Sequence, residues 1–115
     1  MTPEAQNLID DLQALDGPSR EVFMRAYRLL NPSAGVSKHS WRFVHLVDSK
    51  AYHDAALILI PDGMVMSIIG SGDIPEVWLW WKSGGFGTKS SGKHKSIPHA
   101  IIIAAINAGE VERMK

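Results

Sequence analysis

The sequence predicts one domain, residues 1–115, of mixed α/β (α+β) class, in which helices cover a small, mainly antiparallel sheet. Three observations indicate this class. The first 30 residues place apolar side chains at helical spacing, two short middle segments have strand composition, and an Ile- and Ala-rich block lies near the end. A chain of 115 residues is long enough to bury a core of its own.

Two helices are expected at the N-terminus. Thr2 can cap the first helix, and Pro3 suits its first position. The turn Asp16-Gly17-Pro18 ends this helix, and Ser19 can cap the second. The apolar stripes are Leu8, Ile9, Leu12 and Leu15 in the first helix, and Val22, Phe23, Ala26, Leu29 and Leu30 in the second. The short connection predicts that the two helices pack against each other.

The middle of the chain alternates between segment types. Residues 33–40 are polar and predict a loop, whereas Trp41–Val47 has the composition of a strand. Asp48 or Ser49 can cap a third helix over Ala51–Ile60. Pro61-Asp62-Gly63 then predicts a turn.

Two strands are expected next, Met64–Ile69 and Glu76–Lys82, paired antiparallel. Strand alternation places Trp78, Trp80 and Lys82 on one face and Trp81 on the other. Both faces are largely apolar, which predicts that helices cover the sheet on both sides.

A glycine- and lysine-rich insert and an apolar helix complete the chain. The insert, residues 84–96, predicts a loop. The final helix is expected over Ile97–Ala108, with Ser96 as cap and Gly109 at its end. Because it is apolar nearly all round, it should be the most buried helix and should pack on the sheet.

The order of these segments resembles the phage ABA-sandwich family of small bacteriophage and prophage proteins. The family's recurring motifs match a Gly-Pro-Ser-Arg-Glu helix start at Gly17–Glu21, an Asp-Ala-Ala-Leu helix at Asp54–Leu57 with its turn at Ile60–Gly63, and the last helix at Pro98–Ala108. The resemblance covers most of the chain except roughly residues 31–40 and 84–96. It implies a three-layer helix–sheet–helix sandwich of phage origin, and it implies no activity and no catalytic residues.

Composition excludes several classes of function. The formal net charge is +0, whereas proteins that bind nucleic acid over their whole surface are strongly basic and DNA mimics are strongly acidic. The absence of cysteine excludes disulfides, thiolate zinc sites and a cysteine nucleophile. The N-terminus lacks the pattern of a signal peptide and no apolar run reaches the ~20 residues of a membrane span, so the bacterial cytoplasm is the expected compartment.

Catalytic and metal motifs are weak. Gly87, Gly92 and Lys93 imitate the spacing of a phosphate-binding P-loop, but His94 stands where that motif needs Ser or Thr. A less specific site is the alternative, because N–H groups at the start of the last helix, with Lys93 and Lys95 beside them, could hold a phosphate or carboxylate. The five histidines lack ligand spacing, so no metal and no cofactor are expected.

The last third of the chain is therefore the candidate binding region. Residues 77–109 contain four lysines and no acidic residue. The tryptophans of the second strand can be core residues, or they can form an aromatic surface if one helix layer is incomplete. The candidate binding residues are Trp78, Trp80, Lys82, Phe86, Lys89, Lys93, His94 and Lys95.

These observations predict a non-catalytic phage accessory protein that binds a host or phage macromolecule. An inhibitor of a bacterial defence system, of the anti-CRISPR kind or another counter-defence protein, fits this description. The alternative is binding of a nucleotide or single-stranded nucleic acid through the basic loop 84–95. No membrane partner is expected, and the sequence leaves the oligomeric state open.

Overall fold

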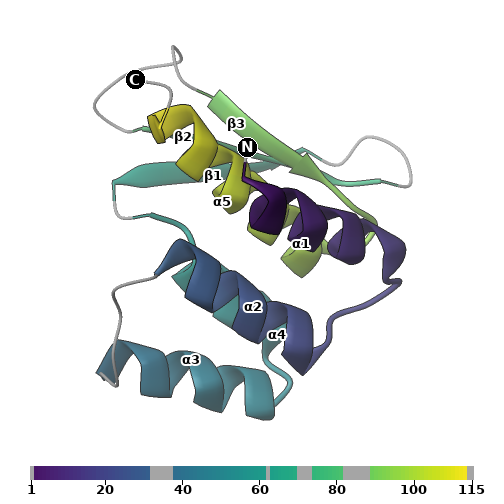
Figure 1. Cartoon of the computed structure of the whole chain (residues 1–115), viewed down its shortest axis with the longest axis vertical. Coiled ribbons are helices and arrows are strands. Elements are labelled where there is room, and N and C mark those ends of the chain that lie inside the picture. The colour runs from purple at the N-terminus through teal and green to yellow at the C-terminus, as the bar shows by residue number, and fades with distance from the viewer. Residues whose placement is uncertain (1, 32–37, 62, 70–73, 82–88, 114–115) are drawn as a thin grey trace.

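A computed structural model describes residues 2–31, 38–61, 63–69, 74–81 and 89–113 of the chain (Figure 1). Its elements are α1 (Pro3–Ala14), α2 (Arg20–Leu30), α3 (Lys38–Asp48), α4 (Tyr52–Ile58), β1 (Met64–Ile69), β2 (Glu76–Trp81), β3 (Lys89–Lys93) and α5 (Ile97–Arg113). The three strands form one antiparallel sheet in the order β1-β2-β3. The predicted mixed α+β class with a small antiparallel sheet is confirmed.

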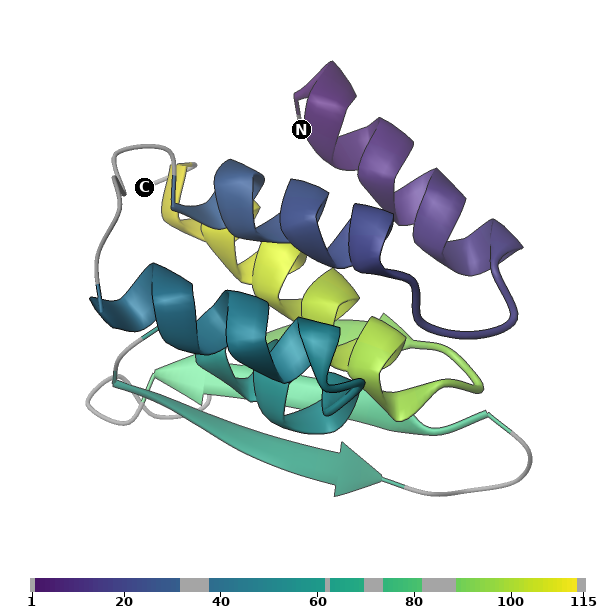
Figure 2. The same ribbon diagram turned by 90° about the horizontal axis from the view of Figure 1, so that it is seen from below.

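The N-terminal helices form as the sequence predicts. The Thr2 hydroxyl accepts a hydrogen bond from the Ala5 N–H at 3.3 Å, and the Ser19 hydroxyl accepts one from the Val22 N–H at 3.4 Å. Each cap satisfies a backbone donor that has no partner inside its helix. The two helices pack together and run in opposite directions (Figure 2).

The predicted strand at Trp41–Val47 is wrong, because these residues belong to α3. Phe43 and Val47 lie four residues apart and are both buried, whereas Trp41 faces outward. The ring of Phe43 packs on Tyr27 of α2, with 4.7 Å between centroids. Packing on α2 thus overrides the strand propensity of this segment. The predicted cap of the next helix is also wrong, since Ala51 precedes α4 and makes no side-chain cap bond.

The third strand, β3, was not expected, because residues 84–96 predict a loop. Serine and glycine are poor strand formers, and tertiary contacts with α5 stabilise this strand instead. The Ser90 hydroxyl donates to the Ala104 carbonyl at 3.1 Å, and the Asn107 side-chain amide donates to the Ser91 carbonyl at 2.8 Å. At Gly92 the backbones approach so closely that an added Cβ would lie 2.7 Å from the Ala104 nitrogen and closer still to the Ala100 carbonyl oxygen.

The order of the layers differs from the expected helix–sheet–helix sandwich. Helix α5 packs on β2 and β3 with one side and against α1, α2 and α4 with the other. It is therefore the middle layer, and the sheet is an outer layer (Figures 1 and 2). Within the described parts of the chain, no helix lies on the opposite face of the sheet.

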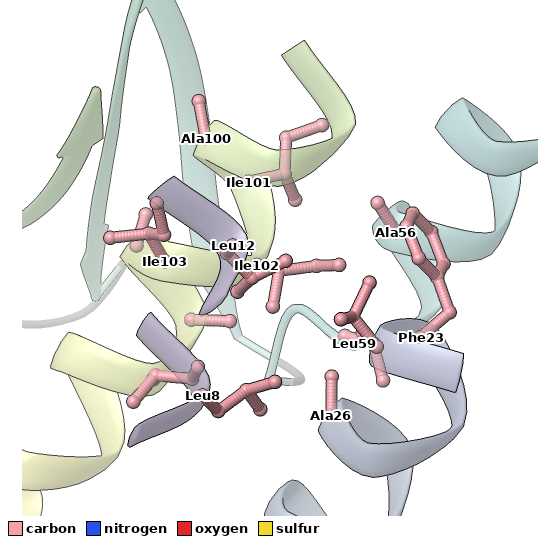
Figure 3. Close-up of a cluster of buried hydrophobic side chains, with 14 of the residues drawn as sticks. Leu8, Leu12, Phe23, Ala26, Ala56, Leu59, Ala100, Ile101, Ile102 and Ile103 are labelled. Atoms are coloured by element: carbon pink, nitrogen blue, oxygen red, sulfur yellow. The ribbon is translucent and has the colours of Figure 1, made fainter. Parts of the chain in front are cut away.

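The core gathers around α5, as Figure 3 shows. Residues 100–106 are all buried, so the prediction of a highly buried final helix is confirmed. Side chains from three other helices meet this helix: Leu8 and Leu12 of α1, Phe23 and Ala26 of α2, and Ala55 and Ala56 of α4. Helix α5 continues through Gly109 to Arg113, so the predicted end at Gly109 is wrong.

Candidate functional site

The sheet face opposite α5, called the outer face below, is the candidate binding surface. Val77 and Leu79 point toward α5 and are fully buried. Because side chains alternate along a strand, Trp78 and Trp80 point to the outer face. The strand register adds neighbours on the same face: Val65, Ser67 and Ile69 from β1, and Ser91 and Lys93 from β3.

The two tryptophans lie at the centre of the outer face. Ser67 and Ser91 flank Trp78 on either side, and Val65 flanks Trp80. Both indole side chains are half-buried. Trp81 lies on the other face, as alternation predicts. No helix of the described residues covers this face, and the Nε1 atom of Trp78 is itself buried.

An ion pair borders the tryptophans. Glu76 and Lys93 are directly opposite in the register, and the lysine Nζ lies 3.1 Å from a Glu76 carboxylate oxygen. The pair leaves this part of the outer face without net charge. The described side chains of the outer face thus combine an aromatic centre with serines and one neutralised ion pair.

The other predicted binding residues do not form one group with the tryptophans in the described residues, although the register places Lys89 opposite Trp80 and Lys93 opposite Glu76 on the outer face. Lys95 points to the α1–α2 connection and pairs with Asp16 at 2.7 Å, a contact that holds the pKa of the Asp16 carboxyl below its ordinary value of 3.8. Lys89 belongs to β3, and its side chain lies outside the described residues, as do Lys82 and Phe86. The expectation that residues 84–95 act as one basic loop is wrong for residues 89–93, which form a strand.

At the start of α5, groups that were expected to hold a phosphate or carboxylate have partners within the chain. The Ser96 N–H donates to Nδ1 of His94 at 2.8 Å, and Lys93 and Lys95 each face a carboxylate. Gly92 packs against α5 as part of a strand, whereas a P-loop needs it in a phosphate-cradling turn.

His94 and His99 form a buried pair below the sheet, so His94 is not available for binding at the surface. Nδ1 of His99 lies 3.1 Å from the Leu12 carbonyl oxygen, which requires a proton on that nitrogen. Nε2 of His99 is then the unprotonated nitrogen, and it is buried without a hydrogen-bond partner among the described residues. Burial, with a smaller contribution from His94, lowers the pKa of His99 to about 4.

Trp41 is a surface residue that was not among the predicted binding residues. Its side chain is 67 % exposed on α3, a high value for an aromatic residue. The helical spacing of Phe43 and Val47 could have revealed the exposed face, but the strand composition of the segment concealed it. A shallow groove of about 300 Å³ between α1 and α2, lined partly by Arg25 and Arg28, was not predicted either.

Searches for relatives leave the family resemblance as a prediction. No family model, no curated protein and no solved structure matches the chain. Within the described residues, no three His, Cys, Asp or Glu side chains are grouped to hold a metal ion. No helix in that same part of the chain has the length and apolar character to cross a membrane.

Proposed function

We propose that this chain is a non-catalytic phage accessory protein that binds a host or phage protein through the outer face. One observation carries the proposal: Trp78 and Trp80 lie side by side on a sheet face without a helix cover in the described residues. Tryptophan is enriched among the residues that dominate protein–protein affinity. The phage origin rests on the resemblance of the sequence to the phage ABA-sandwich family.

The environment of the buried histidines supports a non-catalytic role. His94 and His99 are held by hydrogen bonds to backbone groups and by contact with each other. The ring of Phe23 also packs near His99, with 6.3 Å between ring centroids. Both side chains are shielded from solvent. These contacts suit histidines that stabilise a fold.

The proposed action is inhibition of a bacterial defence system, of the anti-CRISPR kind or another counter-defence, in the host cytoplasm. Binding to a nucleotide or single-stranded nucleic acid has less support, because Lys93 and Lys95 each pair with a carboxylate. A salt titration separates the two, since binding to phosphates weakens steeply as salt rises and binding through indole rings does not.

The test begins with capture of partners from host lysate by the tagged chain, followed by affinity measurement with the purified partner. Trp78→Ala and Trp80→Ala should each weaken binding about thirty-fold, the effect of losing ~2 kcal/mol at a hot spot. Trp41→Ala is the matched control, because it removes a more exposed indole from α3. Circular dichroism checks that each variant is folded.

Two outcomes would contradict the proposal. If Trp41→Ala weakens binding and the two sheet variants do not, the binding surface is α3. If the wild-type chain captures no partner and a phage without it infects defended hosts as well as before, the counter-defence role is wrong.

A further inference from the structure

Strand β1 has one unpaired edge. Among the described residues β1 pairs only with β2, and Figure 2 shows it at the boundary of the sheet. An edge strand presents a row of backbone N–H and C=O groups that can pair with another extended chain. The free edge of β1 is therefore a template for a further strand.

The side chains of β1 do not protect this edge. Natural edge strands carry charges, proline or bulges that block pairing, but Met64–Ile69 contains no charged residue and no proline, and its register with β2 is continuous. Ile68 and Ile69 are 41 % and 48 % exposed and lie on opposite faces of the strand. A strand that pairs here must be extended, apolar and uncharged.

We propose that a second copy of this chain supplies that strand, so that two β1 strands pair antiparallel in a symmetric dimer. Strand β1 itself meets the requirement, since it is extended, uncharged and apolar apart from Ser67, and two copies do not repel each other. A two-fold interface needs one self-complementary patch, and an antiparallel pair of identical strands provides it. The product is a continuous six-stranded sheet in the order β3-β2-β1-β1-β2-β3.

The geometry of such a dimer follows from its symmetry. The two-fold axis of an antiparallel pair of identical strands is perpendicular to the sheet, so each copy keeps its outer face on the same side. Residues opposite each other must share a face, which places Ile69 near the partner's Val65 and Ile68 near the partner's Met66 when the axis passes through Ser67. Both exposed isoleucines thereby become covered.

The helix layer leaves room for this arrangement. Helix α5 lies on β2 and β3, on the side of the sheet away from the β1 edge. Figure 2 shows β1 as the outermost strand of the sheet at that edge. The dimer brings the outer faces of both copies, with Trp78 and Trp80 of each, into one surface. Formation of the dimer does not depend on what that surface binds.

Analytical ultracentrifugation tests the dimer. The wild-type chain should sediment with twice the chain mass of 12.7 kDa at high concentration and dissociate on dilution. Ile68→Lys should sediment at 12.7 kDa throughout, because a charge at the edge blocks pairing. Ile74→Lys is the matched control, since Ile74 is 55 % exposed outside β1, and it should remain dimeric.

Cross-linking gives a second measurement that does not rely on disrupting the strand. The chain has no cysteine, so a single substitution reports on one position. The centre of two antiparallel six-residue strands lies at position 66 or 67, where a residue meets its own copy within disulfide distance. At least one of Met66→Cys and Ser67→Cys should form disulfide-linked dimers at least ten times faster than Ile74→Cys.

A wild-type chain that is monomeric at every concentration would overturn the proposal. So would a dimer that survives Ile68→Lys while neither strand cysteine cross-links faster than Ile74→Cys. The result is separable from the test of the proposed function, because Trp78→Ala and Trp80→Ala should leave the dimer intact. Ile68 lies on the face opposite the tryptophans, so a monomeric Ile68→Lys chain should still contact a protein partner.

Discussion

The two edge strands of the sheet, β3 and β1, are held in place in opposite ways. Strand β3 consists of Lys, Ser and Gly, and its contacts with α5 stabilise it. Strand β1 contains the strong strand formers Val65, Ile68 and Ile69, yet it contacts little beyond β2 and leaves two isoleucines exposed. The difference teaches that packing makes β3 a strand and local propensity makes β1 one. Changes at the β3 edge should therefore affect the stability of the fold, and changes at the β1 edge should affect association with a second copy of the chain.

The largest effect is expected at Gly92. An alanine there would force its Cβ against the backbone of α5, which cannot yield as a flexible side chain can. We expect Gly92→Ala to lower the free energy of unfolding by more than about 3 kcal/mol, at the upper end for overpacked sites. Urea denaturation monitored by tryptophan fluorescence measures the loss.

Gly17→Ala is the matched control for this prediction. No atom lies within 4 Å of the position of an added Cβ at Gly17, so this variant should keep the stability of the wild type. If both glycine variants are equally stable, the close packing of β3 on α5 is wrong.

The effect of the β3–α5 contact also explains how far the sequence could predict this fold. The helix caps at Thr2 and Ser19, the pairing of β1 with β2 and the burial of α5 depend on local patterns, and the sequence predicted them. Strand β3 depends on its contacts with α5, and the local sequence pattern of β3 does not indicate those contacts. The same limit applies to α3, where contacts with α2 and α4 favour the helix over the strand that the composition predicts.

In the candidate site, too, properties set by local sequence were predictable and properties set by contacts with other parts of the chain were not. Alternation correctly predicted that Trp78 and Trp80 share a face, because that property is local. The roles of Lys93, His94 and Lys95 were not predictable, since each side chain meets a partner that another part of the chain supplies. Glu76 pairs with Lys93 from the neighbouring strand, and Asp16 pairs with Lys95 from the α1–α2 connection.

Acidification should cause a second large loss of folding stability, through His99 near the β3–α5 connection. His99 has a pKa of about 4 in the folded chain and an ordinary value of 6.5, so the unfolded chain binds the proton first. Stability is therefore full above pH 6.5 and falls as the pH drops toward 4. The loss should be about 3 kcal/mol, measured by urea denaturation at pH 7 and pH 4. The Asp16 carboxyl, with its lowered pKa, titrates below this range.

His99→Leu removes the titrating group and should flatten this pH dependence, although it also removes the donor to the Leu12 carbonyl and lowers the stability at neutral pH. His53→Gln changes an exposed histidine on α4 and should preserve the full loss on acidification. An acid loss that persists in His99→Leu would assign the titration to other groups.

The smallest effect is expected at the β1 edge. Ile68 lies opposite Val77 in the register, but Ile68 is 41 % exposed whereas Val77 is fully buried. Ile68→Lys should therefore change the free energy of unfolding by only about 0.5 kcal/mol, when measured at a concentration low enough that the chain is monomeric. A loss above ~2 kcal/mol would mean that Ile68 belongs to the core. A small change would show that the fold does not require an isoleucine at this edge, and the apolar character of β1 would then need a reason outside the single chain.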